Sequence, residues 1–147
     1  MRTPGLACDS YRLIDANFNR AKEGLRVCED IVRFHLNHAR LTQKFKNIRH
    51  RLSAILKSAN IDPLGLIQER NIRRDVAKIS CLSKKKASFC QIFLANMQRT
   101  KEALRVLEEF LKLFDKTATR KIQHLRFQCY ALEQETIKKF PALLDPR

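Results

Sequence analysis

An asparagine followed three residues later by an arginine is the pair of side chains in this sequence best suited to binding a ligand, and it occurs twice. Asn17 and Arg20 form the first copy, and Asn96 and Arg99 form the second. An amide offers both a donor and an acceptor, and a planar guanidinium group holds two phosphate oxygens at once. On a helical wheel of ~100° per residue, Asn17 falls within an apolar sector and Arg20 near its edge. Such inward polar groups need partners, which are either a bound anion or a structural network between the two copies.

Both copies lie in a long internal duplication. Residues 14–33 and 93–112 are identical at nine of 20 aligned positions, and 44–55 resembles 121–132 more weakly. Apolar residues in the duplicated segments recur every three or four positions, the period of an α-helix, and the first such pattern covers 14–36. No convincing β-type alternation is present. Each half is therefore predicted to form a helical hairpin.

The predicted fold is all-α, a helical bundle of two pseudo-symmetric helical hairpins within a single domain, 1–147. The hairpins are expected at about 10–57 and 88–138, with an irregular, mostly extended linker at 58–87 that contains a short helix near 63–69. In this arrangement we expect Asn17 to face Asn96 across a shared interior.

The composition is that of a globular protein with a large excess of positive charge. Of 147 residues, 44% are hydrophobic and 31% are charged, and no apolar run approaches the roughly 18 residues of a membrane helix. The start of the chain lacks the apolar stretch of a secretory signal, so we expect a cytoplasmic location and no membrane partner. The 30 Lys and Arg residues against 15 Asp and Glu residues give a net charge of +15, which attracts phosphate groups of some kind.

Much of this charge lies between Asp30 and Asp62, where seven Lys and Arg residues occur without an acidic residue. A solvated basic face explains this pattern, and so does a nucleic-acid-binding surface. The sequence has no Trp and only two Tyr, so it offers few side chains on which bases could stack, and it contains no recognised nucleic-acid-binding motif. We therefore do not expect nucleic acid to be the main partner.

Four parts of the chain match a known family. The longest and most specific is 11–34, which reads YRLIDANFNRAKEGLRVCEDIVRF; the others are 41–52, Arg70 with Asp75-Val76, and 95–109. Together they resemble the ThiD-like domain found ahead of some bacterial thiamine-phosphate synthases, a domain that also has a stand-alone form. Two positions depart from the family pattern, because Asn71 stands where an aspartate usually follows the arginine and Ala77 replaces a glycine.

The resemblance implies a kinase of thiamine biosynthesis that transfers a phosphate group from ATP to hydroxymethylpyrimidine phosphate. Catalysis of phosphoryl transfer rests mainly on positioning and charge neutralisation. On this basis the expected catalytic residues are Arg20, Arg99, Glu23 and Glu102. The expected substrate-binding and phosphate-binding residues are Asn17, Asn96, Arg26, Arg49, Arg70 and Arg126. Mg²⁺, which prefers oxygen ligands, is expected as a cofactor held by Asp75, Glu23 and Glu102.

Two other functions fit the residues. The first is a non-catalytic binding or regulatory domain of the thiamine pathway, an option that the departures at Asn71 and Ala77 leave open. The second is a basic helical protein that binds nucleic acid. A separate thiamine-phosphate synthase is a further expected partner, and the sequence leaves room for an oligomer.

The cysteines predict neither a zinc site nor a disulfide. They are odd in number and contain no C-x-x-C pair: Cys8, Cys28, Cys81, Cys90 and Cys129. We predict that all five thiols react with a thiol reagent after denaturation in non-reducing buffer. A titration that finds fewer than five would contradict this assignment.

Overall fold

The chain folds into a bundle of four long helices in a computed structural model that describes residues 4–76 and 88–144. The long helices are α1 (Pro4–Asp30), α2 (Ala39–Ser58), α4 (Phe89–Leu111) and α5 (Lys116–Lys139), and a short helix, α3 (Pro63–Gln68), follows α2. Three further turns of helix are a π-helix at Ile31–His35 and two 3₁₀ turns at Ile72–Arg74 and Pro141–Leu144. No strand occurs among the described residues, so the all-α prediction is confirmed.

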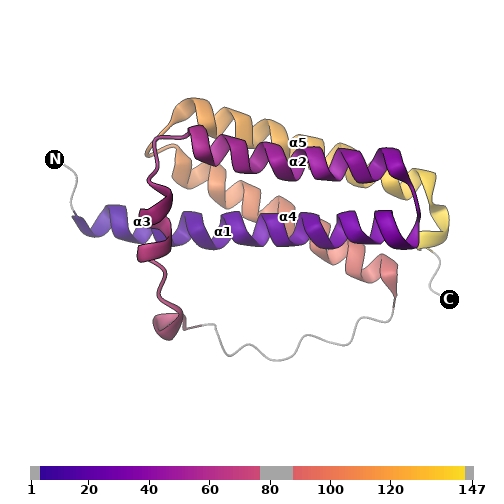
Figure 1. The fold of residues 1–147 in the computed structure, drawn as a ribbon, viewed down its shortest axis with the longest axis horizontal. Helices are drawn as coiled ribbons and strands as arrows, with labels where there is room; N and C mark the ends of the chain where they lie inside the picture. The colour runs from indigo at the N-terminus through magenta and orange to yellow at the C-terminus, as the bar shows by residue number, and fades with distance from the viewer. Residues whose placement is uncertain (1–3, 77–87, 145–147) are drawn as a thin grey trace.

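The two hairpins pack side by side, and each long helix packs mainly against two other long helices. Figure 1 shows α1 and α4 running in opposite directions across each other, with α2 and α5 together on the other side of the bundle. The approximate twofold axis that would relate the hairpins stays a prediction. None of the described helices is both long and apolar enough to cross a membrane.

Side-chain caps fix where the later helices begin. The side chains of Asp62, Ser88 and Asp115 accept hydrogen bonds from backbone N–H groups in the first turns of α3, α4 and α5, and all three are residue types that favour helix N-caps. The ring of His38 caps α2 in the same way. The first helix differs from its predicted range of 14–36, because it begins ten residues earlier and its last turn widens into the π-helix.

The core consists of apolar side chains from all four long helices. Phe45 of α2 and Phe93 of α4 meet edge to face, with ring centroids 6.0 Å apart. Burial raises the pKa of the Cys28 thiol, and it raises the pKa of Cys129 to about 12. The four cysteines in the described part of the chain are free, in agreement with the prediction, and Cys81 lies outside that part.

The backbones of α1 and α4 approach each other closely at Gly24. A Cβ atom added to Gly24 would lie 2.8 Å from the backbone oxygen of Asn96 and would overlap the hydroxyl of Thr100. The Thr100 hydroxyl itself donates to the Asn96 carbonyl at 2.9 Å. Only a residue without a side chain fits between these two helices, which sets their separation.

We predict that Gly24→Ala destabilises the fold by about 1–3 kcal/mol, the usual cost of overpacking, although alanine is the better helix former. Urea unfolding measures the change. Gly24→Ala combined with Thr100→Ala should recover part of the loss, since it removes the hydroxyl but not the carbonyl of Asn96. A Gly24→Ala protein as stable as the parent would contradict this close crossing.

Candidate functional site

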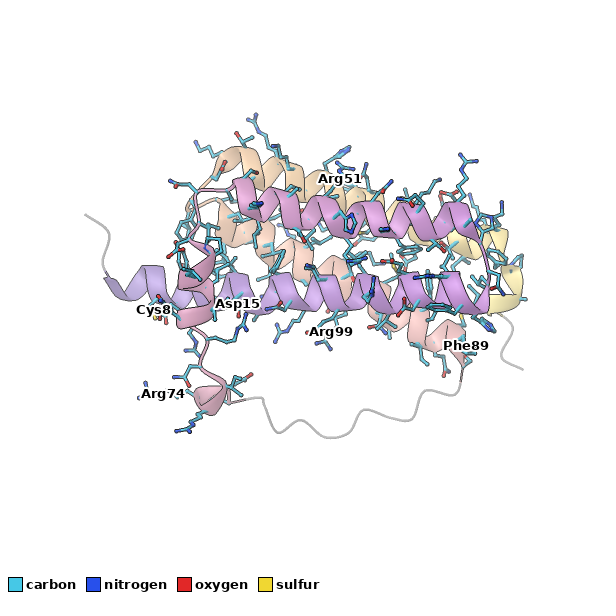
Figure 2. All side chains as sticks on the ribbon, viewed as in Figure 1. Cys8, Asp15, Arg51, Arg74, Phe89 and Arg99 are labelled. Atoms are coloured by element: carbon cyan, nitrogen blue, oxygen red, sulfur yellow. The ribbon has the colours of Figure 1, made fainter. Side chains whose placement is uncertain are left out.

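The segment after α2 folds back over α1 instead of extending away from it. The backbone N–H of Asp62 donates to the Tyr11 hydroxyl at 3.2 Å, and Gly65 lies against the Tyr11 ring. The thiol of Cys8 donates to a Glu69 carboxylate oxygen at 2.7 Å. Figure 2 shows Cys8 and Asp15 on the part of α1 that α3 crosses. The short helix predicted within the linker is therefore confirmed, whereas Ile72–Arg74 forms a 3₁₀ turn where extended chain was expected.

An ion pair holds the end of this segment in place. The guanidinium group of Arg70 donates two hydrogen bonds to the Asp15 carboxylate, both 2.7 Å long, and these bonds raise the pKa of Arg70. Asp15 is buried, so this pairing also satisfies a carboxylate removed from water. The guanidinium group of Arg70 thus anchors the segment to α1 through Asp15.

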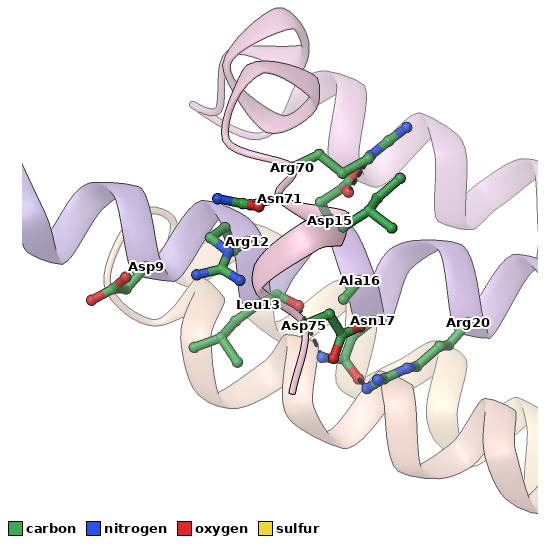
Figure 3. Close-up of a pocket in the computed structure, with 11 residues that line it drawn as sticks. Asp9, Arg12, Leu13, Asp15, Ala16, Asn17, Arg20, Arg70, Asn71 and Asp75 are labelled. Carbon is green, nitrogen blue, oxygen red and sulfur yellow. Dashed lines mark hydrogen bonds and ion pairs between the residues drawn. The ribbon is translucent and has the colours of Figure 1, made fainter. Parts of the chain in front are cut away.

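The folded-back segment and α1 enclose a cavity of about 460 Å³ (Figure 3). Two arginines of α1, Arg12 and Arg20, bring positive charge to it, and Leu13 and Ile72 are among its apolar residues. Its other lining residues are Asp9, Asp15, Ala16, Asn17, Arg70, Asn71 and Asp75. The cavity is therefore mixed in character, with cations, carboxylates and apolar surface.

Asn17 is, like Asp15, a buried polar residue that lines this cavity. Its amide nitrogen donates to the Leu13 carbonyl at 2.9 Å, and its amide oxygen accepts a long hydrogen bond of 3.5 Å from Arg20. Arg20 is exposed, and this one long contact engages only one of its five N–H groups. Asn17 thus orients a guanidinium group at the cavity wall, next to Asp75, which Figure 3 shows beside it.

A second cavity of about 410 Å³ shares Asn17 and Arg20 with the first and extends to α4. Its α4 residues include Arg99 and Glu102. Glu23 lies near this crossing and forms an exposed ion pair with Arg99, 3.8 Å long. The structure therefore brings together the four residues predicted to be catalytic, all at the crossing of α1 and α4. The catalytic role of these four residues stays a prediction.

Asn96, the counterpart of Asn17 in the second half, lines neither of these two cavities. Its amide donates to the Ile92 carbonyl at 2.8 Å, as Asn17 does to Leu13, but its backbone lies opposite Gly24. Gly24 is seven residues, or two helical turns, beyond Asn17 on α1. The expectation that the two asparagines face each other is wrong, because antiparallel helices place Asn17 near Ala103 instead.

Three predicted phosphate-binding arginines belong to buried ion networks, and none of them lines either cavity. Glu29, only 2% exposed, accepts a hydrogen bond of 2.9 Å from Arg49 of α2 and lies 3.5 Å from Arg26. The second half repeats the network, with Glu108 accepting bonds of 2.6 Å from Arg126 and 2.8 Å from Arg105. The bond to Glu108 raises the pKa of Arg126.

These networks lie within each hairpin and join α2 to α1 and α5 to α4, so they differ from the network between the two copies that the sequence offers as an alternative. Sequence reasoning assigned no role to Glu29 and Glu108, although both are conserved between the two halves of the duplication. It also passed over Arg12, whose position eight residues before Arg20 places both side chains toward the same cavity.

The carboxylates expected to hold Mg²⁺ together do not converge. Asp75 lines the first cavity, Glu102 lines the second, and Glu23 pairs with Arg99. The described residues contain no group of three or more side chains that could hold a metal ion. The three residues therefore do not fit a shared metal centre made by protein ligands alone.

The fold and the site together define an all-helical bundle with a cavity that arginines and apolar side chains line. The chain belongs to the ThiD2 family, whose model matches residues 12–135. It is 37% identical over 134 residues to a thiamine-phosphate synthase of Rhodopirellula baltica, covering 90% of this chain and 35% of that protein. It is 36% identical over 127 residues to the thiamine-phosphate synthase of Nostoc punctiforme, covering 84% and 34%.

The chain spans about a third of the length of these relatives. They are enzymes named for thiamine-phosphate synthesis, and none of them is named a hydroxymethylpyrimidine phosphate kinase. This finding corrects the kinase expectation, while membership in a family related to the thiamine pathway is confirmed. No solved structure matches the chain.

The buried networks predict that the two arginines paired with Glu108 contribute differently to the free energy of unfolding. Arg126→Met should lower the free energy of unfolding by about 3 kcal/mol, because it leaves the Glu108 carboxylate buried with weaker pairing. Arg105→Met should cost less than about 1 kcal/mol, since Arg105 is largely exposed. Urea unfolding of both variants provides the comparison, and equal losses would show that Arg126 is not the main partner of Glu108.

Proposed function

We propose that this chain is a binding domain of the thiamine pathway that holds a small phosphorylated pyrimidine in the cavity between α1 and the folded-back segment. The observation that carries the proposal is the pair Arg12 and Arg20 on one wall of a cavity that also contains the buried amide of Asn17. The role assigned to the domain is binding or regulation, without transfer of a phosphate group.

The chemistry of the cavity supports this class of ligand. Two guanidinium groups can share the negative charge of a phosphate through charge-assisted hydrogen bonds. Leu13, Ala16 and Ile72 offer apolar surface to an aromatic ring, and polar side chains such as Asn71 offer it hydrogen bonds. A cavity of about 460 Å³ falls within the range of small-molecule sites.

Family membership supports the pathway. The relatives carry the name thiamine-phosphate synthase, and the segment shared with this chain is about a third of each. A domain that binds a phosphorylated intermediate next to such an enzyme, whether fused to it or separate, could retain that compound or report its level. Mg²⁺ beside Asp75, ATP as a second ligand and a separate thiamine-phosphate synthase as partner remain predictions.

Calorimetric titration with hydroxymethylpyrimidine phosphate tests the proposal. The parent chain should bind it, and Arg20→Lys should weaken binding on the order of tenfold, because lysine keeps the charge but loses the paired hydrogen bonds. Arg12→Lys should act in the same direction. Repeating the titration with Mg²⁺, with a chelator and with ATP present tests the two remaining ligand predictions.

The matched control is Arg33→Lys, the same substitution at an arginine that lies over the Phe34 ring in the π-helix, outside the cavity. It should bind as the parent does. Melting temperatures for all variants separate lost binding from lost folding. Absence of binding by the parent chain, or equal affinity in all three variants, would disprove the assignment of this cavity.

A further inference from the structure

The positive charge of the chain is concentrated on one side of the bundle. Helices α2 and α5 each carry six Lys and Arg residues and together only two Glu, which gives 12 cations against two anions. Helix α1 carries four cations and five acidic residues, and α4 carries three of each. Together they have seven cations and eight anions. The cavity side is thus nearly neutral, and the α2–α5 side holds most of the excess charge.

Most of these cations are free to meet a ligand. Four of the six on α2 and five of the six on α5 are exposed. The two acidic residues of this pair of helices are already engaged, Glu135 with Lys44 and Glu133 with Lys101, each at 2.6 Å. The Lys44 ammonium group lowers the pKa of Glu135, which therefore stays ionised and paired. The Glu135 charge therefore balances that of Lys44, and the exposed cations of α2 and α5 keep their positive charge.

The two helices form one continuous surface. Lys44 reaches Glu135, and Arg51 donates to the Gln128 side chain at 2.6 Å, so α2 and α5 run antiparallel and in contact. A shallow groove of about 310 Å³ lies between them. Figure 2 shows Arg51 at the edge of the bundle where α2 and α5 lie together. A helix of 20 residues is about 30 Å long, so the basic surface extends along a line and is not a compact spot.

This surface is poor in exposed apolar side chains, which the interfaces of other acidic partners use. Among the described residues, the exposed large hydrophobic side chains include none from α2. Those of α5 are Phe127 and Tyr130. Each ring lies beside a cation on the α4 side, Tyr130 under the Lys101 ammonium group of α4 at 4.5 Å and Phe127 under the guanidinium group of Arg126, which pairs with Glu108 of α4, at 4.9 Å. Protein interfaces have apolar, aromatic centres, and helices that lie on membranes insert an apolar face. Interfaces with nucleic acid are more polar and far more positively charged.

We propose that the α2–α5 surface binds the phosphate backbone of nucleic acid without reading its bases. Contacts to phosphate need cations at intervals and need no stacking side chains, so the scarcity of aromatic residues does not oppose this mode. The binding is independent of the cavity and of its ligand. Its affinity falls steeply with salt, because each phosphate contact releases counterions.

Fluorescence anisotropy with a labelled oligouridylate RNA of ~20 nucleotides tests the proposal on the full chain, between about 50 and 200 mM KCl. The triple variant Arg51→Gln, Lys57→Gln, Lys121→Gln removes three exposed cations from the surface. It should bind about tenfold or more weakly at low salt, and the slope of log affinity against log salt should fall by about two.

The matched control is Lys22→Gln, Arg33→Gln, Lys112→Gln, which removes the same residue types and the same net charge outside α2 and α5. Its RNA affinity should change less than about threefold, because these three side chains lie outside the two helices that form the surface. Melting temperatures confirm that both triple variants are folded. A phosphatidylserine vesicle and polyglutamate serve as competitors that represent a membrane and an acidic protein.

Weaker displacement by both competitors than by unlabelled RNA, together with selective loss in the surface variant, supports the proposal. Three results would each overturn it. They are an absence of RNA binding at low salt, equal loss in the two triple variants, and displacement by vesicles or polyglutamate as effective as displacement by RNA.

Discussion

Two carboxylates buried in the bundle, Glu29 and Glu108, constrain much of the structure. A carboxylate at 2% exposure has lost its water and must be paired, so each one fixes an arginine of the next helix against it. These pairs set how α2 lies on α1 and how α5 lies on α4. Because removal of one partner strands a buried charge, the networks favour one register of each hairpin over its neighbours, a specificity that apolar packing alone does not provide.

The close crossing at Gly24 then sets how the two hairpins meet. With no side chain between the backbones, Arg20 of α1 and Arg99 of α4 come to line one cavity. Both arginines are exposed; Arg99 pairs with Glu23 of α1 across the crossing, and Glu102 lines the same cavity. The crossing of α1 and α4 therefore leaves a polar seam of arginines and carboxylates on the surface of the bundle.

The molecule separates its two charged regions by layer. The α1–α4 layer balances its charges, and the folded-back segment, held by the Arg70–Asp15 pair, closes a cavity over it. The α2–α5 layer leaves its cations exposed. A small anion and a long polyanion can thus be accommodated on different faces without competing. The match to the ThiD2 family covers residues 12–135 and therefore includes parts of both layers.

The sequence by itself determined the all-α fold, the two long-helix hairpins and the caps at Asp62, Ser88 and Asp115, because helical period and capping are local properties. It also singled out Asn17, Arg20, Arg99 and Glu102, which the structure gathers at one cavity. Tertiary structure alone decided which arginines are structural. A helical wheel gives the direction of Arg49 or Arg126 but not what lies opposite, and only packing shows that a buried glutamate is there.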